Sequence, residues 1–291
     1  MHRHKFLRHA AAVLAAAALL AAVVLAGPAG ALPGTPFTHR PPGGGGRGRP
    51  GARRYFIGIV GKYGVQVQAV LKKAAALDIE TVCSLHGPVL HKEQLGDVLA
   101  AYDTWSAYRP ETEGVLVAYS SIYGHTAEAA NRLAEALREK GVETVAMDLA
   151  RCDMAEAVAQ AFRFSKLVLA TPTYNADVFP FMKEFIHHLT ERNYQNRTVA
   201  FIENGSWAPM AAKVMTKMLE GSKNLTYATT TVTVRGALNA ASEAQLAALA
   251  DELSRKSSFL STASPASQRV SRAVRRGLFA GRGRGGQQQN N

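Results

Sequence analysis

Apolar runs and amphipathic stretches alternate along the chain from residue 114 onward. Val115–Tyr119 is a short continuous apolar run, typical of a strand that is covered on both faces. Residues 127–140 follow with apolar positions at helical spacing, and Gly141 stands where helices commonly end. The same alternation predicts strands at 144–147, 167–170, 198–202 and 226–234 and helices at 154–164, 180–191, 208–219 and 243–253, the last opened by Ser242 as its N-cap.

Five strands that are each followed by a helix predict an α/β fold with a doubly wound, five-stranded parallel sheet. In such sheets, ligands bind beyond the carboxyl ends of the strands. The loops after the first, third and fourth strands are therefore the candidate site. Each of these loops mixes small polar side chains with an aromatic residue.

The first loop leads directly into a helix, and its hydroxyls, glycine and helix N–H groups suit a phosphate. It has no Lys or Arg and does not match G-x-x-x-x-G-K-[ST], which argues against a nucleoside triphosphatase. A simple helix cap with a turn glycine is the alternative interpretation. The candidate binding residues of the first loop are Ser121, Ile122, Tyr123, Gly124, His125 and Thr126.

The other two loops carry Tyr174 and Trp207, which with Tyr123 place an aromatic residue after each of three strands. A single loop aromatic is more often a packing residue. Three of them favour a flat aromatic ligand, which needs rings for stacking and polar groups for its edge. The candidate residues are Thr171, Pro172, Thr173, Tyr174 and Asn175 in the second loop and Asn204, Gly205, Ser206, Trp207 and Ala208 in the third.

A resemblance to a known family is carried by four segments, SSIYGHTAEAA, ATPTYNADVFP, HHLTERNYQNRTVAFIENGSWAP and AAKVMTKMLEGSKNLTY. They resemble the C-terminal flavodoxin-like domain of the flavodiiron proteins (A-type flavoproteins), over about residues 114–253. The resemblance implies FMN, with its phosphate in the first loop and its ring between the second and third. It implies Trp207 as a ring neighbour, with Tyr123 or Tyr174 next. It also implies a rubredoxin-like or flavin reductase electron donor, a homo-oligomer and a cytoplasmic location.

Residues 55–110 do not fit a flavodoxin. A helix is predicted at 65–77, a strand at 81–83 and a further helix to about residue 102. The run YFIGIVGKYGVQVQAVLKKAAALDIETVCSLHGPVL is similar to the last segment of the metallo-β-lactamase-like domain that precedes the flavodoxin-like domain in flavodiiron proteins. In that family the histidine of the LHGP turn is the final ligand of the diiron site. The resemblance therefore assigns His86 as an orphan metal ligand. Without the resemblance, a single histidine before Gly-Pro would be interpreted as an ordinary turn residue.

The other metal ligands of the family have no counterpart in this sequence. An H-x-E-x-D-H motif occurs nowhere in the chain, and the histidines before His86 are His2, His4, His9 and His39. One imidazole cannot hold two irons, because each iron needs several His or carboxylate ligands. We therefore expect a short α/β remnant of the metallo-domain, with a diiron centre only if the remainder of that domain is supplied.

The formal net charge of +12 suggests a nucleic-acid or membrane partner, but the charge is unevenly placed. Residues 1–54 and 254–291 each hold eight Lys/Arg and no Asp/Glu, which leaves residues 55–253 with a net charge of −4. The basic character belongs to the two ends. No specific nucleic-acid partner is expected for the folded part.

The N-terminus resembles a secretory signal peptide over residues 1–31, with a basic start, an apolar run and small residues at Ala29 and Ala31. Any membrane contact would involve this segment. The alternative is a displaced start, a frameshift or a fusion, because ordinary globular sequence begins abruptly at Tyr55. Low-complexity composition predicts disorder at both ends. The expected organisation is a signal-like or artefactual segment at 1–54, the metallo-domain remnant at 55–110, the FMN-binding domain at 111–255 and a basic tail at 256–291.

The function predicted from these features is that of an FMN-binding electron-transfer module of a flavodiiron-type oxidoreductase. No Ser-His-Asp or Cys-His arrangement marks independent catalysis, and Cys83 and Cys152 read as packed or partly buried thiols. Three alternatives stay open. They are a free-standing FMN-dependent quinone or nitro reductase, a non-redox interaction protein with basic tails, and a truncated gene product without an independent role.

Overall fold

The computed structural model describes residues 49–75, 77, 79–83 and 89–260. This part of the chain divides into two compact units. The first comprises residues 49–56 and 63–107, and the second comprises residues 57–62 and 108–260. Most of the expectations for the two ends of the chain, and the assignment of His86 as a metal ligand, concern residues outside these ranges. The disorder predicted up to residue 54 is wrong for residues 49–54, because they belong to helix α2 (Arg49–Tyr55) and Ala52 and Arg53 are buried in it. Residues 258–260, in the predicted tail, form a short 3₁₀ turn.

The first unit is built on two helices, α3 and α4, that pack against each other. Gln68 on α3 donates to Asp103 Oδ1 (2.9 Å) and to Ser106 Oγ (2.8 Å) on α4. Phe56, Tyr102 and Trp105 form a buried aromatic cluster with ring centroids 5.1–5.4 Å apart. The elements of this unit are α2 (Arg49–Tyr55), α3 (Gly64–Ala74), β1 (Thr81–Cys83), β2 (Val89–His91), antiparallel to β1, and α4 (Lys92–Ser106).

The second unit contains the expected parallel sheet, in the order β4-β3-β5-β7-β8. The first connection leads to one side of β3 and the later ones to the other, so the carboxyl ends of β3 and β5 form the topological switch point. This order and the parallel pairing confirm the expected flavodoxin-like fold. The strands are β3 (Thr112–Tyr119), β4 (Thr144–Asp148), β5 (Phe164–Tyr174), β6 (Asp177–Val178), β7 (Arg197–Asn204), β8 (Leu225–Tyr227) and β9 (Val232–Val234).

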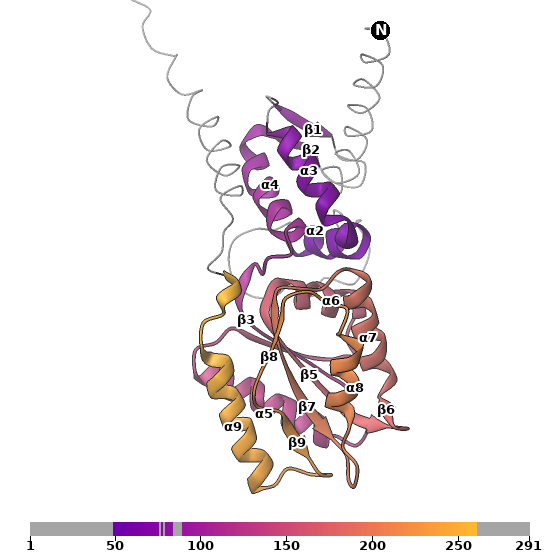
Figure 1. The fold of residues 1–291 in the computed structure, drawn as a ribbon. Coiled ribbons are helices and arrows are strands. Elements are labelled where there is room, and N and C mark those ends of the chain that lie inside the picture. Colours follow the sequence, from indigo (N-terminus) through magenta and orange to yellow (C-terminus); the bar gives the residue numbers. More distant parts are fainter. Residues whose placement is uncertain (1–48, 76, 78, 84–88, 261–291) are drawn as a thin grey trace, which may run out of the picture. The chain divides into compact units, whose positions relative to one another are not determined.

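Helices cover both faces of this sheet, as Figure 1 shows. Buried residues of α5 and α9 form one apolar cluster with every second residue of the strands, for example Leu133, Leu249 and Val168. The alternate strand residues, among them Leu116, Leu167 and Leu169, are also fully buried and face the helices of the other layer. The helices are α5 (His125–Glu139) and α9 (Ala240–Ser254) on the first face and α6 (Met154–Arg163), α7 (Pro180–Glu191) and α8 (Ala211–Met218) on the second.

The strand predicted at 226–234 is wrong as a single element. Two short strands, β8 and β9, pair in succession with β7. Between them, the backbone N–H groups of Thr229 and Thr230 donate to Glu252 on α9, at 2.7 and 3.1 Å. The chain leaves the sheet at this point because a carboxylate satisfies those donors instead of β7.

The starts of two helices also differ from the prediction. The N-cap of α9 is Asn239, whose Oδ1 accepts from the Ser242 N–H at 3.1 Å, while Ser242 Oγ accepts from the Asn239 N–H at 2.9 Å. Ser242 is therefore the third residue of the helix, where it closes a capping box, and not the N-cap. Helix α8 begins at Ala211 and not at 208, and the N–H of Met210, its N-cap, donates to Thr173 Oγ1.

Residues 57–62 are held in the second unit by a buried polar network around Tyr108. The Tyr108 hydroxyl donates to the Gly61 carbonyl (2.9 Å), and Asn193 Nδ2 donates to the Lys62 carbonyl (3.0 Å). Arg197, only 1 % exposed, donates to the Tyr108 carbonyl at 2.8 Å and to the Phe162 carbonyl. Burial lowers the pKa of the Arg197 guanidinium to about 10, so it stays protonated at neutral pH.

Candidate functional site

The first and second loops begin side by side at the switch point. Ser120 Oγ, after β3, lies 2.9 Å from Thr171 Oγ1 on β5, and both side chains are fully buried. This hydroxyl pair joins the carboxyl ends of the two strands. The candidate ligand-binding loops therefore start from one fixed point.

The first loop turns tightly into α5. The Ser121 hydroxyl accepts a hydrogen bond from the Gly124 N–H at 3.1 Å. Gly124 has a φ of +94°, which favours glycine, and it is the N-cap of α5. No side chain caps α5 within the described residues. The N–H groups of its first turn can therefore serve an anion, which fits the prediction of a phosphate at this loop.

The third loop is fixed at both of its ends. At its start, the Gly205 N–H donates to the Val234 carbonyl on β9 at 3.0 Å. The segment that follows the loop is held by Glu203, near the end of β7, which accepts from the Ala212 N–H at 3.0 Å. Glu203 also accepts from the Thr233 hydroxyl at 3.1 Å. A Cβ on Gly205 would lie 2.9 Å from Pro209 Cα, so the loop closes too tightly for a larger residue.

The second loop is a β-hairpin that the sequence did not predict. Strand β6 pairs with Thr173 and Tyr174, and Asn175 and Ala176 form the turn with φ of 50° and 56°. The signal was weak because β6 has only two residues and a non-glycine turn. Thr173 Oγ1 accepts from the Met210 N–H at 3.0 Å, so this hairpin is tied to the segment that follows the third loop.

Aromatic side chains stand exposed on all three loops. Tyr123 and Trp207 are each 89 % exposed, and Tyr174 is 41 % exposed with its ring packed edge-on against Phe179. Such exposure is unusual for large apolar rings and leaves their faces open for stacking. Ile122, His125, Asn175, Ser206 and Ala208 are also exposed.

Other predicted residues point into the protein. Thr126, Thr171 and Asn204 are buried, and Pro172 and Thr173 are half-buried. The hydroxyls of Thr171 and Thr173 and the amide of Asn204 bond to protein groups. A cofactor-binding role for the side chains of these residues stays a prediction.

Outside these loops, we looked for metal-binding groups, reactive cysteines and membrane-spanning helices among the described residues. Among the described residues, no group of three or more His, Cys, Asp or Glu side chains could hold a metal ion. Burial raises the pKa of the Cys152 thiol to about 11, which keeps it protonated. Cys83 is exposed on the short strand β1, so the expectation that it is packed or partly buried is wrong. None of the described helices is both long enough and apolar enough to cross a bilayer.

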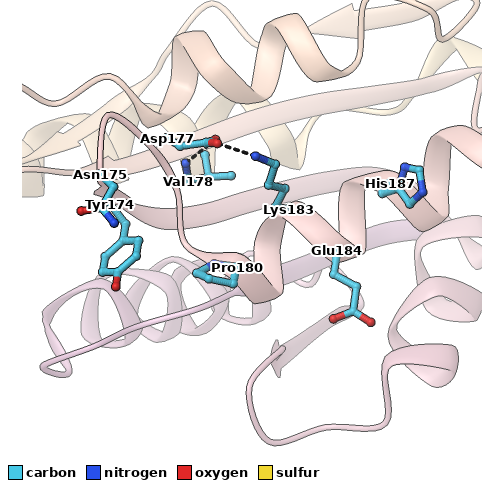
Figure 2. Close-up of a pocket in the computed structure, with 8 residues that line it drawn as sticks. All are labelled: Tyr174, Asn175, Asp177, Val178, Pro180, Lys183, Glu184 and His187. Carbon is cyan, nitrogen blue, oxygen red and sulfur yellow. Dashed lines mark hydrogen bonds and ion pairs between the residues drawn. The ribbon is translucent and has the colours of Figure 1, made fainter.

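An open recess of about 610 Å³ lies beside the second loop (Figure 2). Figure 2 shows Lys183 directed toward Asp177, and this hydrogen bond lowers the pKa of the Asp177 carboxyl. Of the predicted site residues, only Tyr174 and Asn175 reach the recess. Its lining residues are Tyr174, Asn175, Asp177, Val178, Pro180, Lys183, Glu184 and His187.

Comparison with known proteins identifies the class of the second unit. Residues 116–242 match the family model described as a flavodoxin domain. The match includes β5, β7 and β9 and all three candidate loops. The second unit therefore matches a flavodoxin domain over most of its length, as the family resemblance led us to expect.

Longer proteins resemble the chain beyond this domain. It is 28% identical over 177 residues to an uncharacterized protein of Methanocaldococcus jannaschii, covering 60% of this chain and 44% of the relative. It is 22% identical over 172 residues to the rubredoxin-oxygen oxidoreductase of Megalodesulfovibrio gigas, covering 58% and 42%. It is 21% identical over 173 residues to the anaerobic nitric oxide reductase flavorubredoxin of Aeromonas hydrophila, covering 58% and 34%. The chain thus spans less than half the length of these relatives.

Solved structures show the same fold. The rubredoxin oxygen:oxidoreductase of Desulfovibrio gigas superposes with a TM-score of 0.66 at 21% identity, covering 71% of this chain and 52% of that one. The flavodiiron protein of Giardia intestinalis gives a TM-score of 0.61 at 19% identity, covering 78% and 53%. The resemblance to flavodiiron proteins expected from the sequence is confirmed by these matches.

Proposed function

We propose that this chain binds FMN at the carboxyl edge of the flavodoxin domain and serves as the electron-transfer module of a flavodiiron-type oxidoreductase. One observation carries the proposal: Tyr123 and Trp207 stand 89 % exposed on two loops beside the uncapped start of α5. Backbone N–H groups of α5 and the first-loop hydroxyls would hold the phosphate. The exposed aromatic rings would hold the isoalloxazine.

Bound FMN supplies one- and two-electron transfer. The residues of this chain bind and orient it. The hydroxyl pair Ser120–Thr171 fixes where the first and second loops start, and Glu203 fixes the end of the third. The donor set contains no Lys or Arg, so the phosphate would be held by helix N–H groups and hydroxyls without a basic side chain.

The electron donor in this proposal is a protein, either rubredoxin-like or a flavin reductase. Its support is that two relatives are described as a rubredoxin-oxygen oxidoreductase and a flavorubredoxin. We further propose that the protein acts in the cytoplasm as a homo-oligomer. Electrons would pass to a diiron centre only when a complete metallo-domain is supplied, because the described residues contain no cluster that could hold iron.

The direct test is a titration of the purified full chain with FMN, followed by flavin absorbance and calorimetry. We expect one FMN per chain. Trp207→Ala and Tyr123→Ala should each weaken binding about tenfold, since an aromatic pair contributes roughly 0.5–1.5 kcal/mol beyond its buried area. Tyr63→Ala removes an exposed aromatic of the first unit and should leave binding unchanged.

Other outcomes point to the alternatives. Oxidation of reduced nicotinamide by the purified protein without an added reductase would favour a free-standing FMN-dependent reductase. A chain that retains no flavin and binds RNA in a salt-sensitive manner would be a non-redox interaction protein, and the proposal would fail.

A further inference from the structure

The side chain of Asn204 makes three hydrogen bonds to two separate segments at the candidate site. We propose that Asn204 is a positioning residue that couples the first loop to the third, so that the phosphate contribution to flavin binding depends on its amide. This inference rests on the proposed FMN site. It goes further by giving a residue predicted to bind the cofactor a different task.

The first two contacts continue the pairing of β7 and β9 beyond the ends of these strands. Asn204 is the last residue of β7 and lies opposite Val234, the last residue of β9. Beyond Val234, Asn204 Oδ1 accepts from the Gly236 N–H and Nδ2 donates to the Gly236 carbonyl, both at 3.1 Å. The side-chain amide thus acts as a peptide group would in a ladder. It needs a donor and an acceptor together, which a carboxylate or an apolar side chain does not provide.

The third contact reaches the first loop. Asn204 Nδ2 donates to Thr126 Oγ1 at 3.3 Å, and the NH₂ group has two hydrogens for its two acceptors. Thr126 is the second residue of α5 and only 2 % exposed. Its backbone therefore belongs to the turn whose N–H groups would face the phosphate.

Because the Asn204 side chain is buried, we infer that it positions the loops and does not contact the flavin itself. Asn204 is 8 % exposed, and both of its donor hydrogens are used within the protein. Just beyond it, Ser206, Trp207 and Ala208 form the exposed part of the third loop. One buried amide therefore connects the start of α5 with the loop that carries Trp207.

The experiment compares FMN with riboflavin, which has the same ring and no phosphate. The ratio of the two dissociation constants measures the phosphate contribution. Asn204→Ala and Thr126→Val should each lower the preference for FMN about tenfold, the size expected when a buried hydrogen bond is lost. Thr126→Ser keeps the hydroxyl and should retain the preference of the parent chain. Asn131→Ala, at an exposed position of α5, is the matched control.

A double-mutant cycle separates positioning from direct contact. If the Thr126 hydroxyl acts through Asn204, Thr126→Val has no further effect on the FMN preference in the Asn204→Ala background. If Thr126 binds the phosphate by itself, the two effects add and the inference is overturned. Asn204→Leu, a neutral variant of similar volume, replaces Asn204→Ala should the latter fail to fold.

The failure of the inference can be distinguished from that of the proposed function. A parent chain that binds neither flavin overturns both. A parent chain that binds FMN, with the same FMN preference in Asn204→Ala, overturns only the coupling. A general loss of structure would weaken FMN and riboflavin alike, whereas the coupling lowers the preference between them.

Discussion

Gly205 lies where the third loop folds tightly against Pro209. A Cβ at this position would meet Pro209 Cα at 2.9 Å, and backbone atoms cannot move aside as a flexible side chain can. The loop that presents Trp207 therefore depends on a missing side chain. Gly221 is the useful comparison, because nothing lies within 4 Å of a Cβ built there.

We predict that Gly205→Ala lowers the free energy of unfolding by about 1–3 kcal/mol, the usual range for overpacking. It should also weaken FMN binding, because the third loop must shift. Gly221→Ala should stay within about 0.5 kcal/mol of the parent or stabilise it slightly. Urea denaturation of the three proteins measures the difference. Equal stabilities would show that the third loop tolerates the shift.

The exposed residues of the site could be predicted from the sequence, whereas the inward ones could not. Tyr123 and Trp207 follow strand-like runs within polar loops, so their exposure follows from the local pattern. Asn204 has the same local pattern, but its partners lie 78 and 32 residues away. Whether an amide faces a ligand or the protein depends on such distant groups.

Helix α9 does more than cover one face of the sheet. Near its end, Glu252 accepts hydrogen bonds from the backbone N–H groups of Thr229 and Thr230 and from the Thr229 hydroxyl. Desolvation raises the pKa of the Glu252 carboxyl, but these hydrogen bonds outweigh it and the pKa is lowered overall. The ionised carboxylate therefore holds the connection between β8 and β9.

This arrangement predicts an acid-dependent stability. A lowered pKa in the folded state means that Glu252 contributes stability above its ordinary value of 4.5, and that the contribution is lost as the pH falls below it. Glu252→Gln should cost about 1 kcal/mol at pH 7, because hydrogen bonds to an ionised acceptor are stronger than neutral ones. Thermal unfolding of both proteins at pH 7 and near pH 3 tests this. A difference that persists undiminished in acid would contradict it.

Among the secondary-structure elements, those with a clear period were predicted and those set by individual hydrogen bonds were not. The strands β3, β4, β5 and β7 follow apolar runs that any parallel sheet would bury. The break between β8 and β9 arises from Glu252, which no local pattern reveals. The hairpin at β6 and the N-cap at Asn239 depend likewise on hydrogen bonds and not on hydrophobicity.

The NYQNR segment, which helped to mark the family resemblance, serves the architecture of the second unit. Arg197 is the first residue of β7, at the opposite end of that strand from Asn204. Its guanidinium and the Asn193 amide hold Tyr108 and residues 57–62. The segment is therefore remote from the candidate site, and its role could be seen only once residues far apart in sequence were placed together.

We predict that Tyr108→Phe destabilises the protein by about 1–2 kcal/mol, because the Gly61 carbonyl loses its buried donor. Amide hydrogen exchange should accelerate in residues 57–62 before it does in β3 or β5. Tyr227→Phe, a change at a partly exposed tyrosine of β8, should have no such effect. Unchanged exchange in residues 57–62 would show that their place does not depend on this hydroxyl.

The position of residues 57–62 also bears on how the chain is made. Lys62 binds Asn193, which follows it by 131 residues, so this short segment emerges from the ribosome long before its partner exists. Synthesis proceeds from the N-terminus at roughly 5–20 residues per second, so Asn193 is added several seconds or more after Lys62. Residues 63–107, which belong to the first unit, are completed during that wait. The second unit is therefore completed only when its earliest segment docks onto residues that are made much later.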